Sequence, residues 1–200
     1  MNEVIKKVYQ FNKENKSTIA KALGHILSSD DVSMNIKMYM IDKLLMRTTE
    51  RENDESKNNK YYGQPYWTKK ALEQIINQNN NMSIDKLKFI HEHCIPKKLI
   101  RNVILTLEKK DYKSIMHILE NLAYAVVATE DDDRVLRKKG LNAKMPINHK
   151  LEINNTISNI FARYREAKIE IYKVRDVDNL SIENETDINA LFCKVEKVDL

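Results

Sequence analysis

The sequence predicts an α+β protein that is mainly helical, and three observations support this prediction. Apolar residues recur at helical spacing through most of the 200 residues. Residues 86–95 instead alternate in the period-two manner of a strand. Short apolar segments at 123–128, 169–174 and 190–198 predict three more strands. The hydrophobic fraction of 42% is enough to build a core, and no internal repeat is present.

The first fifty residues are predicted to be helical. Apolar side chains repeat at helical spacing over residues 4–27, with a break expected near residues 15–17. Ser33 is a good N-cap for the next helix, whose apolar positions run over residues 36–45. The methionines of this segment are expected to act as adaptable core filler.

A polar segment separates these helices from the rest of the chain. Residues 49–60 contain almost no apolar side chains, which predicts a linker or mobile loop. An aromatic turn around Tyr66 and Trp67 is expected next, with Trp67 as a packing anchor. Thr68 can then cap a helix that ends before the polar patch at 77–81.

Beyond Pro96 the apolar spacing becomes helical again. Asp111 and Thr129 are expected to cap two of the helices, and the second has an acidic first turn at 130–133. The helices predicted in this part of the chain cover residues 97–107, 112–122, 130–140 and about 153–167. The strands at 169–174 and 190–198 are expected to be joined by an acidic loop.

Composition excludes several functional classes. Three glycines are too few for glycine-rich phosphate loops, and no nucleotide-binding motif occurs. The two cysteines, Cys94 and Cys193, lie far apart, which argues against a disulfide framework or a cysteine zinc site. No apolar segment approaches the length of a membrane span and the N-terminus has no signal-peptide core, so a cytoplasmic location without membrane contact is expected.

The positive charge is unevenly distributed. The net charge is +5, but residues 175–200 carry seven acidic and three basic side chains, so residues 1–174 carry +9. A basic body attracts polyanions, of which nucleic acid is the most abundant in a cell. Lysine-rich composition alone can also produce such a balance.

Glu92 and His93 form the most promising chemical centre. Hydrolysis of a phosphodiester needs a base to deprotonate water and a divalent cation to stabilise charge on the leaving oxygen. An imidazole beside a carboxylate can supply the base and part of the metal site. Carboxylates from the acidic turn at 130–133 would complete an oxygen-rich site suited to Mg²⁺ or Mn²⁺.

The segment Glu92-His93-Cys94-Ile95-Pro96 resembles the core motif of HNH, or ββα-metal, endonucleases. The motif order over residues 61–170 is similar to that of a group of bacterial proteins often labelled HNH-like nucleases. The matching segments are Tyr66-Trp67-Thr68, residues 91–98, residues 125–129 with the acids that follow, Gly140-Leu141, Met145-Pro146 and Ala162-Arg163-Tyr164. The chain departs from the family in its long helical excursion after Pro96, in an aspartate where the helix usually offers His or Asn, and in lacking cysteine zinc pairs.

The resemblance implies a role for each residue. His93 would be the general base and Glu92 a metal ligand, with Asp133, or else Asp132, as the carboxylate from the helix. Asn121 is a candidate to orient His93. The implied fold is a small ββα-metal-like core with a helical insertion and an N-terminal helical extension.

Basic side chains near this centre could contact the phosphates of DNA. They are Lys97, Lys98, Arg101, Arg134, Arg137, Lys138 and Lys139. Arg163 and Arg165 could add to this surface. The sequence division that follows is an N-terminal helical extension (1–48), a polar linker (49–60), an HNH-like core region (61–174) and a C-terminal acidic loop and strand (175–200).

Other interpretations of these residues stay open. His93 could be a structural histidine at a strand end, and the acids at 130–133 could simply favour the helix dipole. A metal site of His91, His93 and His117 is also conceivable. At the level of function, the alternatives to a nuclease are a non-catalytic nucleic-acid-binding or adaptor protein and a helical interaction module, in which residues 1–50 bind a partner or a second copy.

Overall fold

The structure is a computed structural model that describes residues 3–49, 61, 64–76, 88–149, 160–174 and 195–198, with the backbone alone for residues 3–13, 76, 195 and 196. Its described helices are α1 (Glu3–Ser28), α2 (Met34–Arg47), α3 (Lys69–Ile76), α4 (Lys97–Leu105), α5 (Tyr112–Leu122), α6 (Glu130–Lys138) and α8 (Ala162–Ala167). Its described strands are β1 (Tyr66–Thr68), β2 (Phe89–His93), β3 (Ala125–Thr129), β4 (Ile171–Val174) and β5 (Val195–Lys197). The prediction of a mainly helical α+β fold is confirmed.

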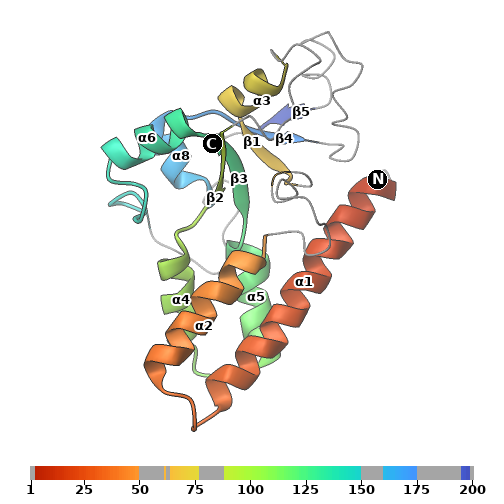
Figure 1. Cartoon of the computed structure of the whole chain (residues 1–200), viewed down its shortest axis with the longest axis vertical. Coiled ribbons are helices and arrows are strands. Elements are labelled where there is room, and N and C mark those ends of the chain that lie inside the picture. Colours follow the sequence, from red (N-terminus) through yellow and green to blue (C-terminus); the bar gives the residue numbers. More distant parts are fainter. Residues whose placement is uncertain are drawn as a thin grey trace.

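The strands form one mixed sheet in the order β2-β3-β1-β4-β5. β1 runs parallel to β3 and antiparallel to β4, whereas β2 pairs antiparallel with β3 over its whole length, from Phe89 opposite Thr129 to His93 opposite Ala125. β2 is therefore the edge strand of the sheet that the described residues form. Figure 1 shows α3, α6 and α8 around this sheet, with α1, α2, α4 and α5 extending below it.

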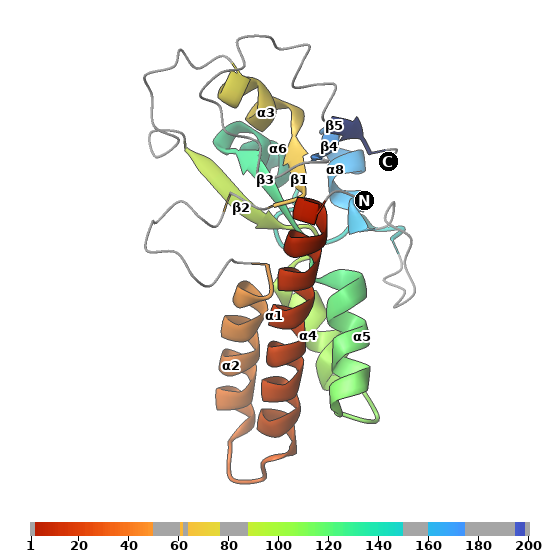
Figure 2. The same cartoon turned by 90° about the vertical axis from the view of Figure 1, so that its right-hand side faces the viewer.

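The four lower helices form a bundle that continues from the sheet. α1 packs along α5 and α2 packs along α4, and Figure 2 shows the four helices side by side below the strands. A single cluster of buried residues runs through both parts of the molecule. It includes Leu23 of α1, Ile41 of α2, Ile104 of α4, Leu119 of α5, Val126 of β3 and Ile171 of β4.

Four predicted N-caps lie where they were expected. The Thr68 hydroxyl accepts a hydrogen bond from the Ala71 amide at 3.2 Å at the start of α3. Asp111 accepts a hydrogen bond from the Ser114 amide at 2.9 Å at the start of α5. Thr129 starts α6 with a capping box, and Ser33 occupies the N-cap position of α2 without making a side-chain cap bond. Gly140 follows α6 with a φ of 67°, a conformation that favours glycine at a helix end.

The structure corrects two local predictions. The helix break near residues 15–17 is wrong, because α1 continues through this segment. Its polar residues are held by tertiary contacts: the Asn15 amide donates to the Arg47 carbonyl at 2.6 Å, and the Lys16 amine lies over the Tyr124 ring at 4.4 Å. The aromatic turn at Tyr66 is instead the central strand β1, which is buried throughout and too short to show a period in sequence.

The remaining elements agree in kind with the sequence but differ in length. The strands predicted at 86–95, 123–128, 169–174 and 190–198 appear as β2, β3, β4 and β5, and α8 occupies the end of the helix predicted at 153–167. The polar segment from residue 50 to 60, the patch at 77–81 and the acidic loop lie outside the described residues. None of the helices in the described part is long and apolar enough to cross a membrane.

Candidate functional site

The strand–strand–helix order expected around Glu92 and His93 is present. β2 and β3 are paired, and α6 begins at the residue after β3 and packs against both strands. α4 and α5 form the helical excursion between the two strands and belong to the lower bundle. Among the described strands, β2 pairs on one side only.

Asp132 is part of the frame that supports this unit. It is only 2% exposed, and its Oδ2 atom accepts hydrogen bonds from the Thr129 amide (3.1 Å), the Thr129 hydroxyl (2.8 Å) and the Thr68 hydroxyl (2.7 Å). Since this oxygen caps α6 and ties it to β1, the structure gives Asp132 a structural role rather than that of a free metal ligand.

Glu92 faces the side of β2 that α6 and α8 cover. Its Oε1 atom accepts a hydrogen bond from Nη2 of Arg163 at 2.8 Å. Burial raises the pKa of the Glu92 carboxyl above its usual value, while the charge and hydrogen bond of Arg163 act in the opposite direction. The carboxylate is thus half-buried beside a cation.

Arg163 organises the end of β2. It has no exposed surface, and its Nε atom donates to the Cys94 carbonyl at 3.0 Å while Nη2 also donates to the His93 carbonyl. Its Nη1 atom reaches the loop after α6 and donates to the carbonyls of Leu141 (2.8 Å) and Asn142 (3.1 Å). A buried side chain of this kind cannot contact nucleic acid, so the surface role predicted for Arg163 is wrong.

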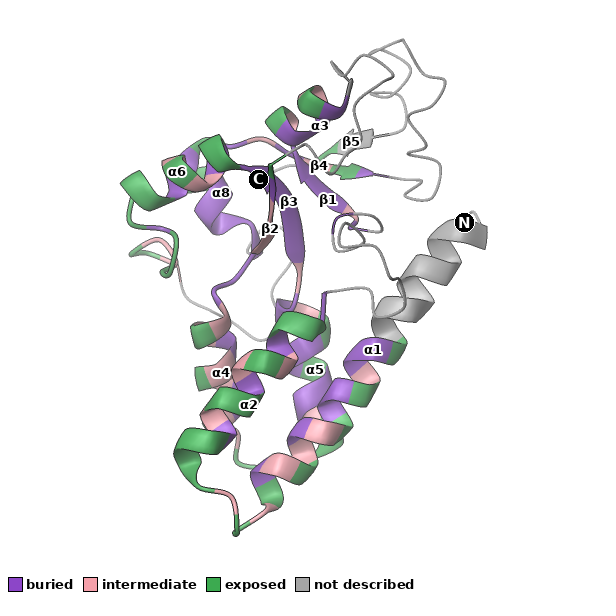
Figure 3. Cartoon of the chain, in the orientation of Figure 1, coloured by how far each residue is buried: buried purple, intermediate pink, exposed green. Residues whose placement is uncertain are grey.

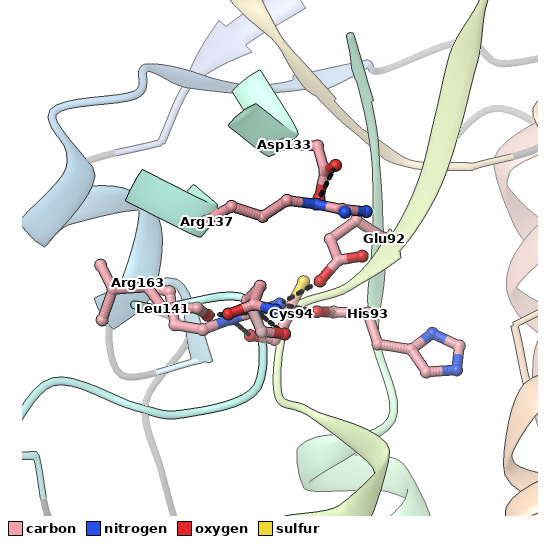
Figure 4. Close-up of polar contacts among 8 residues, drawn as sticks. Glu92, His93, Cys94, Asp133, Arg137, Leu141 and Arg163 are labelled. Carbon is pink, nitrogen blue, oxygen red and sulfur yellow. Dashed lines mark hydrogen bonds and ion pairs between the residues drawn. The ribbon is translucent and has the colours of Figure 1, made fainter. Parts of the chain in front are cut away.

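Asp133 lies on the same side of β2 as Glu92. Figure 4 shows both carboxylates there, with Arg137 reaching toward them from α6. Asp133 pairs with Nε of Arg137 at 2.7 Å, and the Arg137 side chain is 68% exposed. The negative charge of Asp133 contributes to the raised pKa of Glu92, as expected for neighbouring carboxylates.

His93 points to the opposite face of β2, toward α2, as Figure 4 shows. Successive residues of a strand alternate between faces, so adjacent side chains on a regular strand are separated in this way. Neither ring nitrogen of His93 makes a hydrogen bond of ordinary geometry to a described residue, although the Leu45 carbonyl lies near enough to favour protonation. Burial, followed by the charges of His91, Lys97 and Arg163, lowers the pKa of His93 to about 3.

A cleft of about 610 Å³ connects the two sides at the edge of β2. Asp42 and Met46 of α2 line it together with Lys97 and Lys98 at the start of α4. His91, Glu92 and His93 also line it, and the rings of the two histidines lie 5.6 Å apart. The cleft therefore brings a carboxylate, two lysines and the ring of His93 together, although both nitrogens of that ring are buried.

The predicted orienting residue does not reach His93 by a hydrogen bond. The Asn121 amide donates to the His117 carbonyl at 2.7 Å, one turn earlier in α5. His117 is exposed on that helix and does not line the cleft, so the structure does not bring it into the site of His91 and His93.

Most of the predicted phosphate-binding residues lie away from the cleft. Only Lys97 and Lys98 line it, whereas Arg101 pairs with Asp42. On α6, Arg134 pairs with Asp131 at 2.9 Å, and just beyond the helix the Lys139 amine donates to the Glu166 carbonyl at 2.8 Å. Lys138 is exposed at the end of α6. Basic side chains at the C-terminal end of α6 are also favoured by the helix dipole.

Asp42 and Met46 are site residues that the sequence does not single out. They belong to the N-terminal helices, outside the segment that resembles HNH proteins, and only the packing of α2 on α4 brings them to β2. A single aspartate within an apolar helix carries no local signal of such a position.

As they stand, the described side chains form no group of three or more His, Cys, Asp or Glu residues that could hold a metal ion. Glu92 and Asp133 supply two carboxylates on one side of β2, of which only Glu92 lines the cleft. Comparisons of the chain with models of protein families, with curated proteins and with solved structures gave no match.

Proposed function

We propose that this protein is a metal-dependent endonuclease of HNH type that hydrolyses phosphodiester bonds in DNA at the β2 cleft. The observation that carries the proposal is the convergence of His93, Glu92, Lys97 and Lys98 on one cleft beside an edge strand. The strand–strand–helix order of β2, β3 and α6 agrees with this function. Function here is inferred from the groups that line the cleft rather than from the fold alone.

His93 is the proposed general base. Burial lowers the pKa of His93 to about 3, so its imidazole is neutral at pH 7. Both ring nitrogens are buried, so the side chain would have to turn into the cleft before it could accept a proton from water. Lys97 is one of the cations that lower this pKa. A phosphate bound beside Lys97 would neutralise that charge and raise the pKa of His93, which would strengthen the base when substrate is present.

Glu92 and Asp133 are the residues that would hold Mg²⁺ or Mn²⁺. Two carboxylates fit the chemistry of Mg²⁺, which usually takes one or two protein carboxylates and completes its shell with water and substrate phosphate. Arg137 would have to leave Asp133, and because its side chain is largely exposed this change costs little. When bound, the ion would stabilise charge on the leaving oxygen.

The proposed substrate must reach groups on both faces of β2. Glu92 and His93 lie on opposite faces, so one phosphodiester would have to approach both around the edge of β2 that pairs with no other described strand. The cleft lies at this edge. Lys97 and Lys98 would fix the phosphates there without reading base sequence.

A second candidate function is nucleic-acid binding without cleavage. It is favoured by the pairing of the described carboxylates in and near the cleft: Glu92 with Arg163, Asp42 with Arg101, Asp133 with Arg137 and Asp132 with the cap of α6. Such pairs would be expected in a protein that keeps the fold but not the chemistry.

Cleavage of plasmid and single-stranded DNA with Mg²⁺ or Mn²⁺ separates the two functions. For a nuclease we expect His93→Ala to lower the rate by about 10²–10⁴-fold, the usual contribution of a general base. His117→Ala is the matched control, because His117 is an exposed histidine outside the cleft, and it should cut at the normal rate. Unchanged cleavage by His93→Ala would contradict the mechanism.

Binding is measured in parallel by gel shift at several salt concentrations. DNA binding that weakens with salt and with Lys97→Ala, in a protein that cuts no substrate, would support the second function. Absence of both cleavage and binding would rule out both.

A further inference from the structure

α2 carries exposed apolar side chains that the core does not account for, and of these only Met46 lines the cleft. The large exposed hydrophobic side chains of the described residues are seven in number, and five of them are on this helix. They are Met34, Ile36, Tyr39, Met40 and Met46. Tyr39 is 63% exposed and Ile36 54%, and Figure 3 shows the exposed side of α2 facing outward along the lower bundle.

The helix is divided into two faces. Lys37, Ile41 and Leu45 are buried against α1 and α4, which is the face that holds α2 to the molecule. Ile36, Tyr39 and Met46 follow at spacings of three and seven residues, so they share the opposite face. Such concentrated apolar exposure on one helix usually marks a binding surface rather than the scattered apolar residues of an ordinary surface.

The exposed charges around this surface differ in sign between the two ends of α2. Asp30 and Asp31 are exposed in the turn before α2, whereas Lys43 and Arg47 are exposed in its second half. The Lys43 amine lies over the Tyr39 ring, 5.4 Å from its centre, so its aliphatic stem stays along the apolar surface. One end of the helix is thus acidic and the other basic.

We propose that this face of α2 binds the same face of a second copy of the chain, with the two helices antiparallel. A twofold pairing brings the same patch of both copies together and places the acidic end of each helix beside the basic end of the other. With the axis at Tyr39, Arg47 lies eight residues, or about 12 Å, toward the end of the helix. Asp31 lies eight residues before Tyr39, in the turn that leads into α2, so each aspartate is placed at the same end of the pair as the partner's arginine. The antiparallel arrangement also opposes the two helix dipoles favourably.

This pairing explains why the surface is apolar along its length and carries acidic side chains at one end and basic side chains at the other. A partner protein of other sequence would need no such internal complementarity, whereas a self-pairing surface requires it. Tyr39 would be the central anchor, since large aromatic side chains at the centre of an interface carry most of its binding energy.

Sedimentation velocity on the full chain, from about 1 to about 100 μM, tests the proposal. We expect a monomer–dimer equilibrium that Tyr39→Glu weakens by about thirtyfold or more. Lys113→Glu, an exposed change of charge on α5, is the control and should leave the equilibrium unchanged. Tyr39 is exposed, so circular dichroism should show an intact fold. A chain that is monomeric throughout this range would overturn the proposal, as would a dimer that Tyr39→Glu leaves intact.

Charge reversal tests the antiparallel register. Asp31→Lys and Arg47→Glu should each weaken self-association by about tenfold, because each places like charges at both ends of the pair. A mixture of the two variants should dimerise as well as the wild type, because both end pairs then regain opposite charges. Failure of the mixture to recover would refute the antiparallel pairing.

Discussion

At the scale of single residues, Arg163 contributes more to this structure than any motif suggested. It donates to three successive residues at the end of β2 and to two carbonyls after α6, all from a position without exposed surface. A buried charge of this kind is tolerated only because every polar partner is satisfied. The local sequence predicted a surface arginine because a basic side chain near an aromatic residue does not reveal its burial.

Replacement of Arg163 therefore has a large expected effect on folding. Arg163→Met leaves the Glu92 carboxylate and several carbonyls buried without a donor, and should lower the free energy of unfolding by about 3–5 kcal/mol. Arg165→Met, an exposed change on the same helix, should stay within about 0.5 kcal/mol. Urea unfolding of both variants measures the difference, and equal losses would show that the contacts of Arg163 do not stabilise the fold.

The lowered pKa of His93 predicts how the stability of the fold changes at acid pH. Its pKa is about 3 in the folded chain and 6.5 in the unfolded one, so the unfolded state binds more protons between these values. Its contribution to stability is therefore complete above about pH 6.5 and is lost as the pH falls toward 3, by at most about 5 kcal/mol. Glu92, whose pKa is raised, acts in the opposite direction.

His93→Phe isolates this contribution. The ring keeps most of its volume and loses two buried nitrogen atoms that make no hydrogen bond of ordinary geometry within the described part of the chain, so the variant should fold at pH 7 and lose less stability than the wild type between pH 6.5 and 4. Denaturant unfolding at several pH values measures the slope. Parallel slopes in the two proteins would mean that His93 is not kept neutral by its surroundings.

At the scale of elements, the start of α6 shows how one pattern can serve two purposes. Thr129 followed by acids at 130–133 is favoured by any helix N-terminus and also supplies the carboxylates that a metal site would need. The structure divides the acids between these purposes: Asp132 closes the capping box, and Asp133 lies toward Glu92.

Asp132→Asn tests the structural half of this division. The carboxylate oxygen accepts three hydrogen bonds from Thr68 and Thr129, and an amide cannot accept all three. We expect a loss of about 2 kcal/mol in the free energy of unfolding. Asp131→Asn, which alters only an exposed pair with Arg134, should be near neutral, and a similar result for both would argue against the cap.

At the scale of the whole molecule, the N-terminal helices complete both the core and the cleft. α1 and α2 share one buried cluster with α4 and α5, and α2 supplies Asp42 and Met46 to the cleft beside β2. The helical excursion after β2 thereby has a reason: its two helices give α1 and α2 a surface on which to pack. The same packing leaves the outer face of α2 exposed.

The sequence alone determined the mainly helical α+β class, three of the cap bonds and four of the five described strands. These follow from periodicity and capping, which act over a few neighbouring residues. It also pointed to the segment around Glu92 and His93, because adjacent side chains of this chemistry are visible without a fold.

Only the tertiary structure decided how those side chains are used. The continuity of α1 depends on Arg47 and Tyr124, the strand at Tyr66 on its neighbours in the sheet, and the burial of Arg163 on backbone carbonyls from two segments. The alternation of β2 separates Glu92 from His93, and the packing of α2 brings Asp42 to their cleft. These outcomes depend on contacts between residues far apart in the chain, which local patterns do not encode.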